Sequence, residues 1–101
     1  MPFMIVANDA PGVAELRAKV RPAHIAYLEA NLDKIVAAGA MLADDGKTAI
    51  GSLYLIDTDL REEAEQFIRH DPYMQEGVFA GFEATRWRKG VFDGRSFIKR
   101  T

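Results

Sequence analysis

Two short segments of the sequence hold residue types suited to proton transfer. Residues 21–28 read RPAHIAYL and contain His24, and residues 71–73 read DPY and begin with Asp71. A neutral imidazole can take up a proton near neutral pH, and a carboxylate that accepts its other ring N–H fixes its tautomer and orientation. Spacing alone cannot show that the two side chains meet, because they lie in distant parts of the chain.

His24 has two interpretations. Pro22 fits the first turn of a helix, where its missing N–H costs nothing, so His24 is expected in that same turn. The free N–H groups and partial positive charge of a helix N-terminus favour neutral imidazole, the form that a general base needs. The simpler interpretation is an ordinary half-exposed histidine, since such residues are far commoner than well-placed bases.

Four other residues have a functional and a simpler interpretation. Asp71 before Pro72 is typical of an N-cap with proline at the first helical position, which alone would justify it. Arg21 could bind an anionic substrate or remain solvated, as lone arginines usually do. Ser52, which follows a glycine, could point into a pocket or only permit close packing, and Tyr73 could line the same pocket or pack in the core.

Hydrophobic periodicity predicts the elements that must position these residues. A helix is expected from an apolar stripe of Ile25, Leu28, Leu32, Ile35 and Val36, with Gly39 as its C-terminal cap. Whether residues 13–20 form a separate helical turn is left open. Asp59 and Glu62 resemble a capping pair for a second helix. The remaining expected elements are strands over 3–7, 40–44, 49–57 and 78–88, a hairpin turn at 44–48 in which Asp45-Gly46 can adopt positive φ, a second helix through residues 60–68, and a helical turn at 71–77.

The order β-α-β-β-α-β predicts an α+β, ferredoxin-like fold, with a four-stranded antiparallel sheet and both helices on one face. The strands are nevertheless apolar on both faces. In the third strand Ile50, Tyr54 and Ile56 are expected on one face and Leu53 and Leu55 on the other, and in the fourth strand Phe82 and Ala84 are expected on one face and Phe79 and Trp87 on the other. A bare apolar face would exceed what monomers usually expose, so we expect a homodimer packed sheet to sheet.

Composition narrows the classes of protein further. The 101 residues, 49% hydrophobic and 28% charged, suit one globular domain. A net charge of −2 gives no basic surface for nucleic acid, and the absence of cysteine excludes disulfides and thiolate chemistry. No metal-ligand spacing or cofactor motif is present, so no metal and no cofactor are expected. The N-terminal residues lack a basic leader and no apolar run is long enough to cross a membrane, which predicts a cytoplasmic protein without membrane contact.

The segments VRPAHIAYLEANLDKIVAAGAMLADDG and IGSLYLIDTDLREEAEQFIRHDPYMQEGVFAGFEATRWRKG resemble the YCII-related (YciI-like) family. RPAH, then GSLYL, and then DPY with GVF four residues after the tyrosine are fairly specific in this order. The resemblance implies a ferredoxin-like fold that dimerises into an α+β barrel, and a proposed His–Asp dyad that falls on His24 and Asp71. It covers about residues 3–89, so residues 1–101 are expected to form a single YCII-related domain with a C-terminal extension from about residue 89.

The resemblance also suggests a function. A relative removes chloride from a hydroxylated aromatic ring, and related barrels isomerise lactones. We therefore expect an enzyme in which His24, oriented by Asp71, takes a proton from a small cyclic or aromatic substrate bound by Arg21, Ser52 and Tyr73, without a cofactor. The alternative is a non-catalytic module of the same fold that binds a small ligand or pairs subunits. A cofactor-free oxygenase of this fold is a third possibility.

Overall fold

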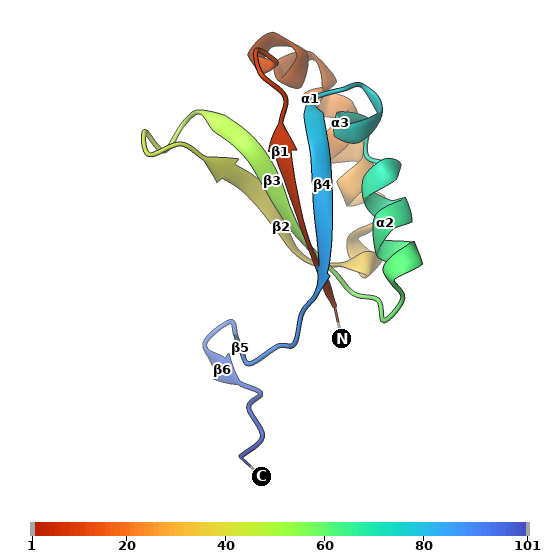
Figure 1. Cartoon of the computed structure of the whole chain (residues 1–101), viewed down its shortest axis with the longest axis vertical. Coiled ribbons are helices and arrows are strands. Elements are labelled where there is room, and N and C mark those ends of the chain that lie inside the picture. The colour runs from red at the N-terminus through yellow and green to blue at the C-terminus, as the bar shows by residue number, and fades with distance from the viewer. Residues whose placement is uncertain (1, 101) are drawn as a thin grey trace.

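The computed structural model describes residues 2–100 and has the predicted ferredoxin-like architecture. Its four-stranded sheet has the order β2-β3-β1-β4, and all neighbouring strands are antiparallel. The helices lie together on one side of this sheet (Figure 1). The elements of this body are β1 (Phe3–Asp9), α1 (Ala14–Glu29), the 3-10 helix η1 (Leu32–Lys34), β2 (Ile35–Leu42), β3 (Ala49–Ile56), α2 (Arg61–Arg69), α3 (Pro72–Gln75) and β4 (Phe79–Arg86).

The core forms between the sheet and the helices. Alternate residues of the central strand β1, namely Phe3, Ile5 and Ala7, are completely buried. Their neighbours across the β1–β3 ladder continue the same face, because Phe3 pairs with Ile56 and Ile5 with Tyr54. Side chains of α2 cover this face, with Ala64, Phe67 and Ile68 buried against it. The period-two alternation of the strands therefore sets which residues contact the helices.

The opposite face of the sheet is also apolar, as expected. Met4 pairs with Leu55 and Val6 with Leu53, and all four side chains are only partly buried. The assignment of Phe79 to this face is wrong, because its side chain is 3% exposed and belongs to the core. The β1–β4 register shifts between Asn8 and Asp9, and the extra residue in β4 reverses the alternation beyond that point.

The first helix occupies a different part of the chain from the predicted one. It starts at Ala14, so residues 14–20 form its first two turns, and it ends at Glu29. Pro22 lies inside the helix and not in its first turn. The segment from Ile35 is strand β2, which contains Gly39, so Gly39 is not a helix cap. The β-branched pair Ile35 and Val36 continues the helical spacing by coincidence but adopts the extended backbone that such residues favour.

Two turns bear on the remaining predictions. The Asp59–Glu62 capping pair is wrong, because the N-cap of α2 is Leu60, without a side-chain cap bond. The hairpin turn is confirmed, but of the Asp45-Gly46 pair only Gly46 has positive φ, at 71°. The Asp45 carboxylate instead accepts hydrogen bonds from the backbone of Lys47 and Thr48.

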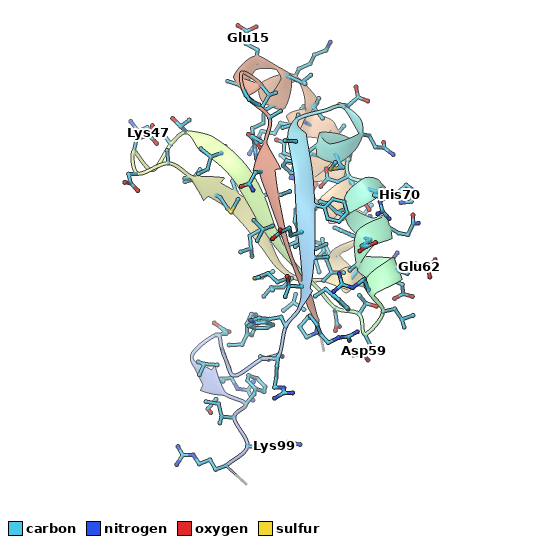
Figure 2. The ribbon with its side chains drawn as sticks, in the orientation of Figure 1. Glu15, Lys47, Asp59, Glu62, His70 and Lys99 are labelled. Atoms are coloured by element: carbon cyan, nitrogen blue, oxygen red, sulfur yellow. The ribbon has the colours of Figure 1, made fainter. Side chains whose placement is uncertain are left out.

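After β4 the chain leaves the body. Residues 91–96 form a small hairpin of β5 (Val91–Phe92) and β6 (Arg95–Ser96), which projects beyond the end of the sheet, and Lys99 lies in the segment that follows it (Figures 1 and 2). Within residues 2–100, no helix has both the length and the apolar character needed to span a bilayer.

Candidate active site

Helix α1 presents a polar stripe toward β2 and β3. Arg17, Arg21 and His24 are spaced by four and three residues, which places them on one side of the helix. His24 therefore lies in the middle of α1 and not in its first turn. The expected influence of the helix N-terminus on its imidazole does not apply, since that effect falls off beyond the first turn.

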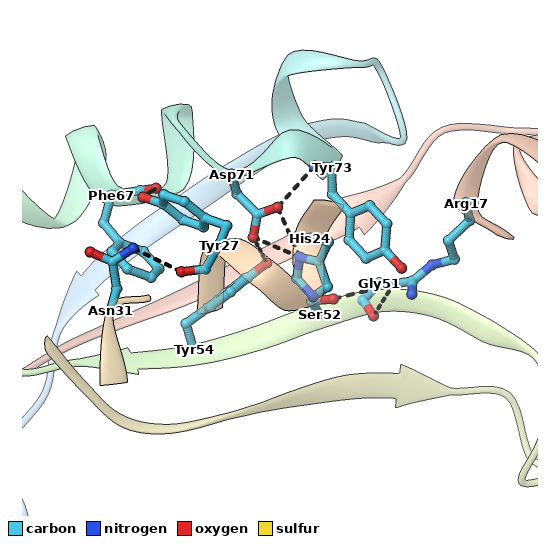
Figure 3. A network of polar contacts seen from close by, with 10 residues as sticks. All are labelled: Arg17, His24, Tyr27, Asn31, Gly51, Ser52, Tyr54, Phe67, Asp71 and Tyr73. Atoms are coloured by element: carbon cyan, nitrogen blue, oxygen red, sulfur yellow. Dashed lines mark hydrogen bonds and ion pairs between the residues drawn. The ribbon is translucent and has the colours of Figure 1, made fainter. Parts of the chain in front are cut away.

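His24 is in direct contact with Asp71. Its Nδ1 lies 2.8 Å from Oδ1 and 2.9 Å from Oδ2 of the carboxylate (Figure 3). A carboxylate accepts a hydrogen bond, so Nδ1 is the protonated ring nitrogen and Nε2 is left with a free lone pair. Nε2 makes no hydrogen bond to any residue between 2 and 100, and the His24 side chain is 12% exposed. The ring is thus held in the tautomer that a general base requires.

Asp71 is fully buried, and its charge is surrounded by donors. Besides His24, it accepts hydrogen bonds from the Tyr54 hydroxyl at 2.8 Å and from the Tyr73 backbone N–H at 2.9 Å. The last bond makes Asp71 the N-cap of α3, as the sequence predicts. Burial, followed by the nearby Asp71 charge, raises the pKa of Tyr54 far above its ordinary value, so the phenol remains a donor. The same carboxylate therefore caps α3 and binds the His24 ring.

The phenol ring of Tyr73 packs against one face of the His24 imidazole. Its ring stacks on His24 with centroids 3.9 Å apart and planes 12° apart. The Arg17 guanidinium lies 4.6 Å from the centre of the same ring, so Tyr73 is placed between a cation and the imidazole (Figure 3). Tyr73 is 1% exposed, which limits its freedom to move. The stack fixes the plane of His24, while Asp71 fixes its rotation.

Arg17 is the residue of the site that the sequence analysis missed. Its guanidinium pairs with Asp9 at 2.9 Å and donates to the Gly51 carbonyl at 2.9 Å and to Ser52 Oγ at 3.2 Å. Glycine is required at position 51 by the neighbouring strands and not by Arg17, because a Cβ there would collide with the Ala7 carbonyl oxygen and the Met41 side chain. Arg17 lies one helical turn before Arg21, on the same side of α1. A predicted helix that began at Ala14 would therefore have indicated Arg17 as a site residue.

These side chains surround a cavity of about 170 Å³ between α1 and the β2–β3 ladder. Arg21, His24, Ser52 and Tyr73 line it directly, whereas Asp71 lies behind His24. The other lining residues are Arg17, Ile25, Leu28, Ala38, Gly39, Ala40 and Tyr54. All five residues singled out from the sequence are thus brought together at one place.

A second cavity of about 270 Å³ is larger but lacks a comparable arrangement. It is lined by His70, whose Nδ1 bonds the Gln66 carbonyl of its own helix at 2.8 Å. Among residues 2–100, no carboxylate makes a hydrogen bond or ion pair with that ring. The smaller cavity is therefore the better candidate, since it alone combines a histidine with a buried orienting acid. Among residues 2–100, no cluster of three or more His, Asp or Glu side chains is placed to hold a metal ion.

The model of the YCII-related domain matches residues 1–88. The chain belongs to the YCII-related family. Two YCII relatives, both named Protein YciI, come from Escherichia coli O6:H1 and Shigella flexneri. Each is 30% identical over 96 residues, spanning 88% of this chain and 98% of the relative. The predicted family membership is confirmed, and the match ends close to residue 89, where the extension was expected to begin.

A solved structure similar to this YCII chain is 5-chloro-2-hydroxyhydroquinone dehydrochlorinase from Burkholderia phenoliruptrix AC1100, in complex with 2,5-dihydroxybenzoquinone. The TM-score is 0.80 and the sequence identity is 33%. The similarity covers 89% of this chain and 96% of the other. That neighbour is a dehydrochlorinase, and it binds a small ring compound.

Proposed function

We propose that this chain is a small-molecule enzyme in which His24 acts as a general base on a hydroxylated ring substrate. The observation that carries the proposal is the contact between His24 Nδ1 and the buried Asp71 carboxylate, at 2.8 Å, with Nε2 left free beside a cavity. Asp71 keeps the base in the required tautomer and stabilises the imidazolium formed when it takes a proton. A positioned base of this kind contributes about 10²–10⁴-fold to a rate.

The reaction that we favour is loss of hydrogen halide from a halogenated, polyhydroxylated aromatic ring. Two ring hydroxyl protons leave, one proton is returned to the carbon that bears the halogen, and the halide departs with the electron pair of its bond. The balance is one hydrogen halide lost and one quinone formed, with no external oxidant. Nε2 of His24 is the group that accepts and returns protons in this sequence. Isomerisation of a cyclic substrate needs the same proton transfers without a leaving group.

The cavity walls supply the binding groups of the proposal. Arg21 gives one wall positive charge, which favours an acidic phenol or its anion, whereas the charge of Arg17 is balanced by Asp9. Ser52 can hydrogen-bond a ring hydroxyl, and Tyr73, whose ring faces are covered by His24 and Arg17, can contact an aromatic substrate through its ring edge. We assign Arg21, Ser52 and Tyr73 to substrate binding on this basis.

The test is release of chloride from a series of chlorinated hydroxyhydroquinones, followed for the wild-type chain and the His24→Gln variant. We expect turnover by the wild type and a rate at least about 100-fold lower for the variant. The exposed His70→Gln substitution is the matched control and should leave the rate unchanged, because it lies at the other cavity. Equal rates for His24→Gln and wild type would exclude the proposed base.

The second candidate is a non-catalytic module that binds a small ligand. The bond from the Tyr73 amide to Asp71 favours it, because helix capping alone accounts for that carboxylate. Binding of 2,5-dihydroxybenzoquinone without turnover of any halogenated or cyclic substrate in the series would support this function over the enzyme.

We further propose a cytoplasmic homodimer packed through the outer face of the sheet. Met4, Val6, Leu53 and Leu55 form a partly exposed apolar surface there, opposite the helices. A second copy would cover this surface in a self-complementary contact. Light scattering at micromolar concentration should give twice the mass of the chain, and a stable monomer would contradict the dimer.

A further inference from the structure

The C-terminal residues of this sequence differ in net charge from the preceding residues taken together. Residues 87–100, here called the C-terminal arm, hold five Lys or Arg and one Asp, a net charge of +4. Residues 1–86, here called the body, hold eight Lys or Arg and 14 Asp or Glu, a net charge of −6. The family match ends at residue 88. Most of the arm is therefore an addition to the family domain, with a charge opposite to that of the body.

The arm has a defined shape but little of its own to stabilise it. Asp93 and Gly94 adopt positive φ of 53° and 73°, which closes the β5–β6 hairpin, and the Phe97 amide bonds the Gly90 carbonyl at 2.7 Å. Lys89 lies over the rings of Phe92 and Phe97, and Phe92 is partly buried, but Val91 and Ile98 remain 61% and 59% exposed. An isolated two-stranded hairpin is marginally stable in water, so these side chains need a surface to pack on.

The arm's own body does not supply that surface. The amide of Trp87 bonds the Pro2 carbonyl, and from there the arm runs away from the end of the sheet (Figure 2). β4 is an edge strand, so the arm leaves the body at the margin of the apolar outer face. We propose that the arm of one copy of this chain lies against the body of a second copy. The proposal rests on the homodimer of the proposed function, but not on its chemistry.

Charge favours a second copy over other acceptors for the arm. A body of net charge −6 attracts the +4 arm of its partner, and the symmetry of a dimer makes the contact twice. An anionic bilayer would also attract the arm, but it would repel the body to which the arm is attached. In this contact, the exposed side chains of Val91 and Ile98 would pack on the partner's body, and the Lys and Arg side chains of the arm would surround them.

The decisive experiment detects the arm on its partner directly. The chain has no cysteine, so Ser96→Cys gives a single thiol in β6 for a spin label. Spin-labelled chains are mixed with nitrogen-15-labelled wild-type chains and allowed to exchange. We expect loss of amide peak intensity on a limited set of body residues of the wild-type partner. A dimer whose partner peaks are unchanged overturns the proposal while leaving the homodimer intact, and a monomer overturns both.

Substitutions provide a second measurement in the full chain. Ile98→Ser should raise the dimer dissociation constant about tenfold or more, whereas Leu32→Ser, which replaces an apolar residue 66% exposed on the body, should not. Lys99→Glu should raise it about threefold to tenfold at low salt, and Lys47→Glu, an equal charge change on the β2–β3 hairpin, should have less effect. Unchanged constants for Ile98→Ser and Lys99→Glu, together with Lys99-dependent binding to anionic vesicles, would overturn the proposal and assign the arm to a membrane.

Discussion

The imidazole of His24 lies parallel to the phenol ring of Tyr73, with ring centroids 3.9 Å apart. The two residues come from α1 and α3, which are distant in sequence, so the stack joins α1 to the helix that Asp71 caps. Any change that tilts the Tyr73 ring should therefore move His24 relative to a substrate in the cavity.

Removing this ring should impair turnover without removing the base. Tyr73→Leu is expected to lower kcat about tenfold to a hundredfold, because small misplacements of a catalytic group are costly. Tyr73→Phe keeps the stack and should stay within about threefold of wild type. Steady-state kinetics on a substrate of the wild type make the comparison. Equal kcat for the Leu and Phe variants would show that the stack has no positioning role.

The two roles of Asp71 can be separated by comparing it with its partner. Asp71→Asn should lower both activity, by about 10²–10⁴-fold, and the free energy of unfolding, by about 1–3 kcal/mol, because a buried acceptor for three groups is altered. His24→Gln should lose similar activity with less effect on stability, since Asp71 keeps its bonds to Tyr54 and Tyr73. Denaturant unfolding and kinetics on the same samples give both quantities. Loss of stability with no dependence of any reaction on either residue would favour the ligand-binding module.

The Arg17–Asp9 pair should show strong coupling. Its side chains are 14% and 10% exposed, and Asp9 Oδ1 has no hydrogen-bond partner among the described residues, so Asp9 depends on Arg17. Arg17→Leu should cost about 3 kcal/mol of unfolding free energy by leaving a buried carboxylate unpaired. The added Asp9→Asn substitution should recover part of that loss in a double-mutant cycle. Additive losses would show that the pair is not coupled.

Stability should fall at alkaline pH through the tyrosines. Burial, and then the Asp71 charge, raise the pKa of Tyr27 from 10.0 to about 12. The unfolded chain then releases this proton first, so the contribution of Tyr27 is fully present below pH 10 and is lost as the pH rises toward 12. Unfolding measured across this range should show a shallower decline for Tyr27→Phe. An identical decline in the variant would assign the effect to other groups.

The strand pattern and the turn residues were enough to predict the fold class, because period-two alternation and DPY, NDAPG and DDGKT define most boundaries. They could not place α1. Pro22 indicates a helix start on local propensity, but packing of the helix on the sheet outweighs the cost of a proline in its interior. Because the predicted helix began too late, it did not include Arg17, which lies in the first turns of α1.

The site was predictable only in part for a similar reason. Asp71 as an N-cap follows from local chemistry, and the cap bond is present. Its contact with His24 depends on how α1 and α3 cross the sheet, which spacing along the chain does not encode, and only the family resemblance anticipated it. The position of Phe79 could not be predicted from local chemistry. The bulge opposite Asp9 shifts the register by one residue and turns Phe79 into the core, and no sequence pattern indicates this bulge.

Because Asp71 both caps α3 and binds His24, its presence in a related sequence does not by itself indicate activity. A lineage that abandoned the chemistry would still be selected to keep the acid, because α3 and the tyrosines around it need the same oxygens in order to fold. Nε2 of His24 bonds no residue between 2 and 100, so no comparable structural role would retain the histidine, and drift would remove it first. Under the proposed mechanism, retention of the histidine, and not of the aspartate, would therefore distinguish sequences that keep the chemistry.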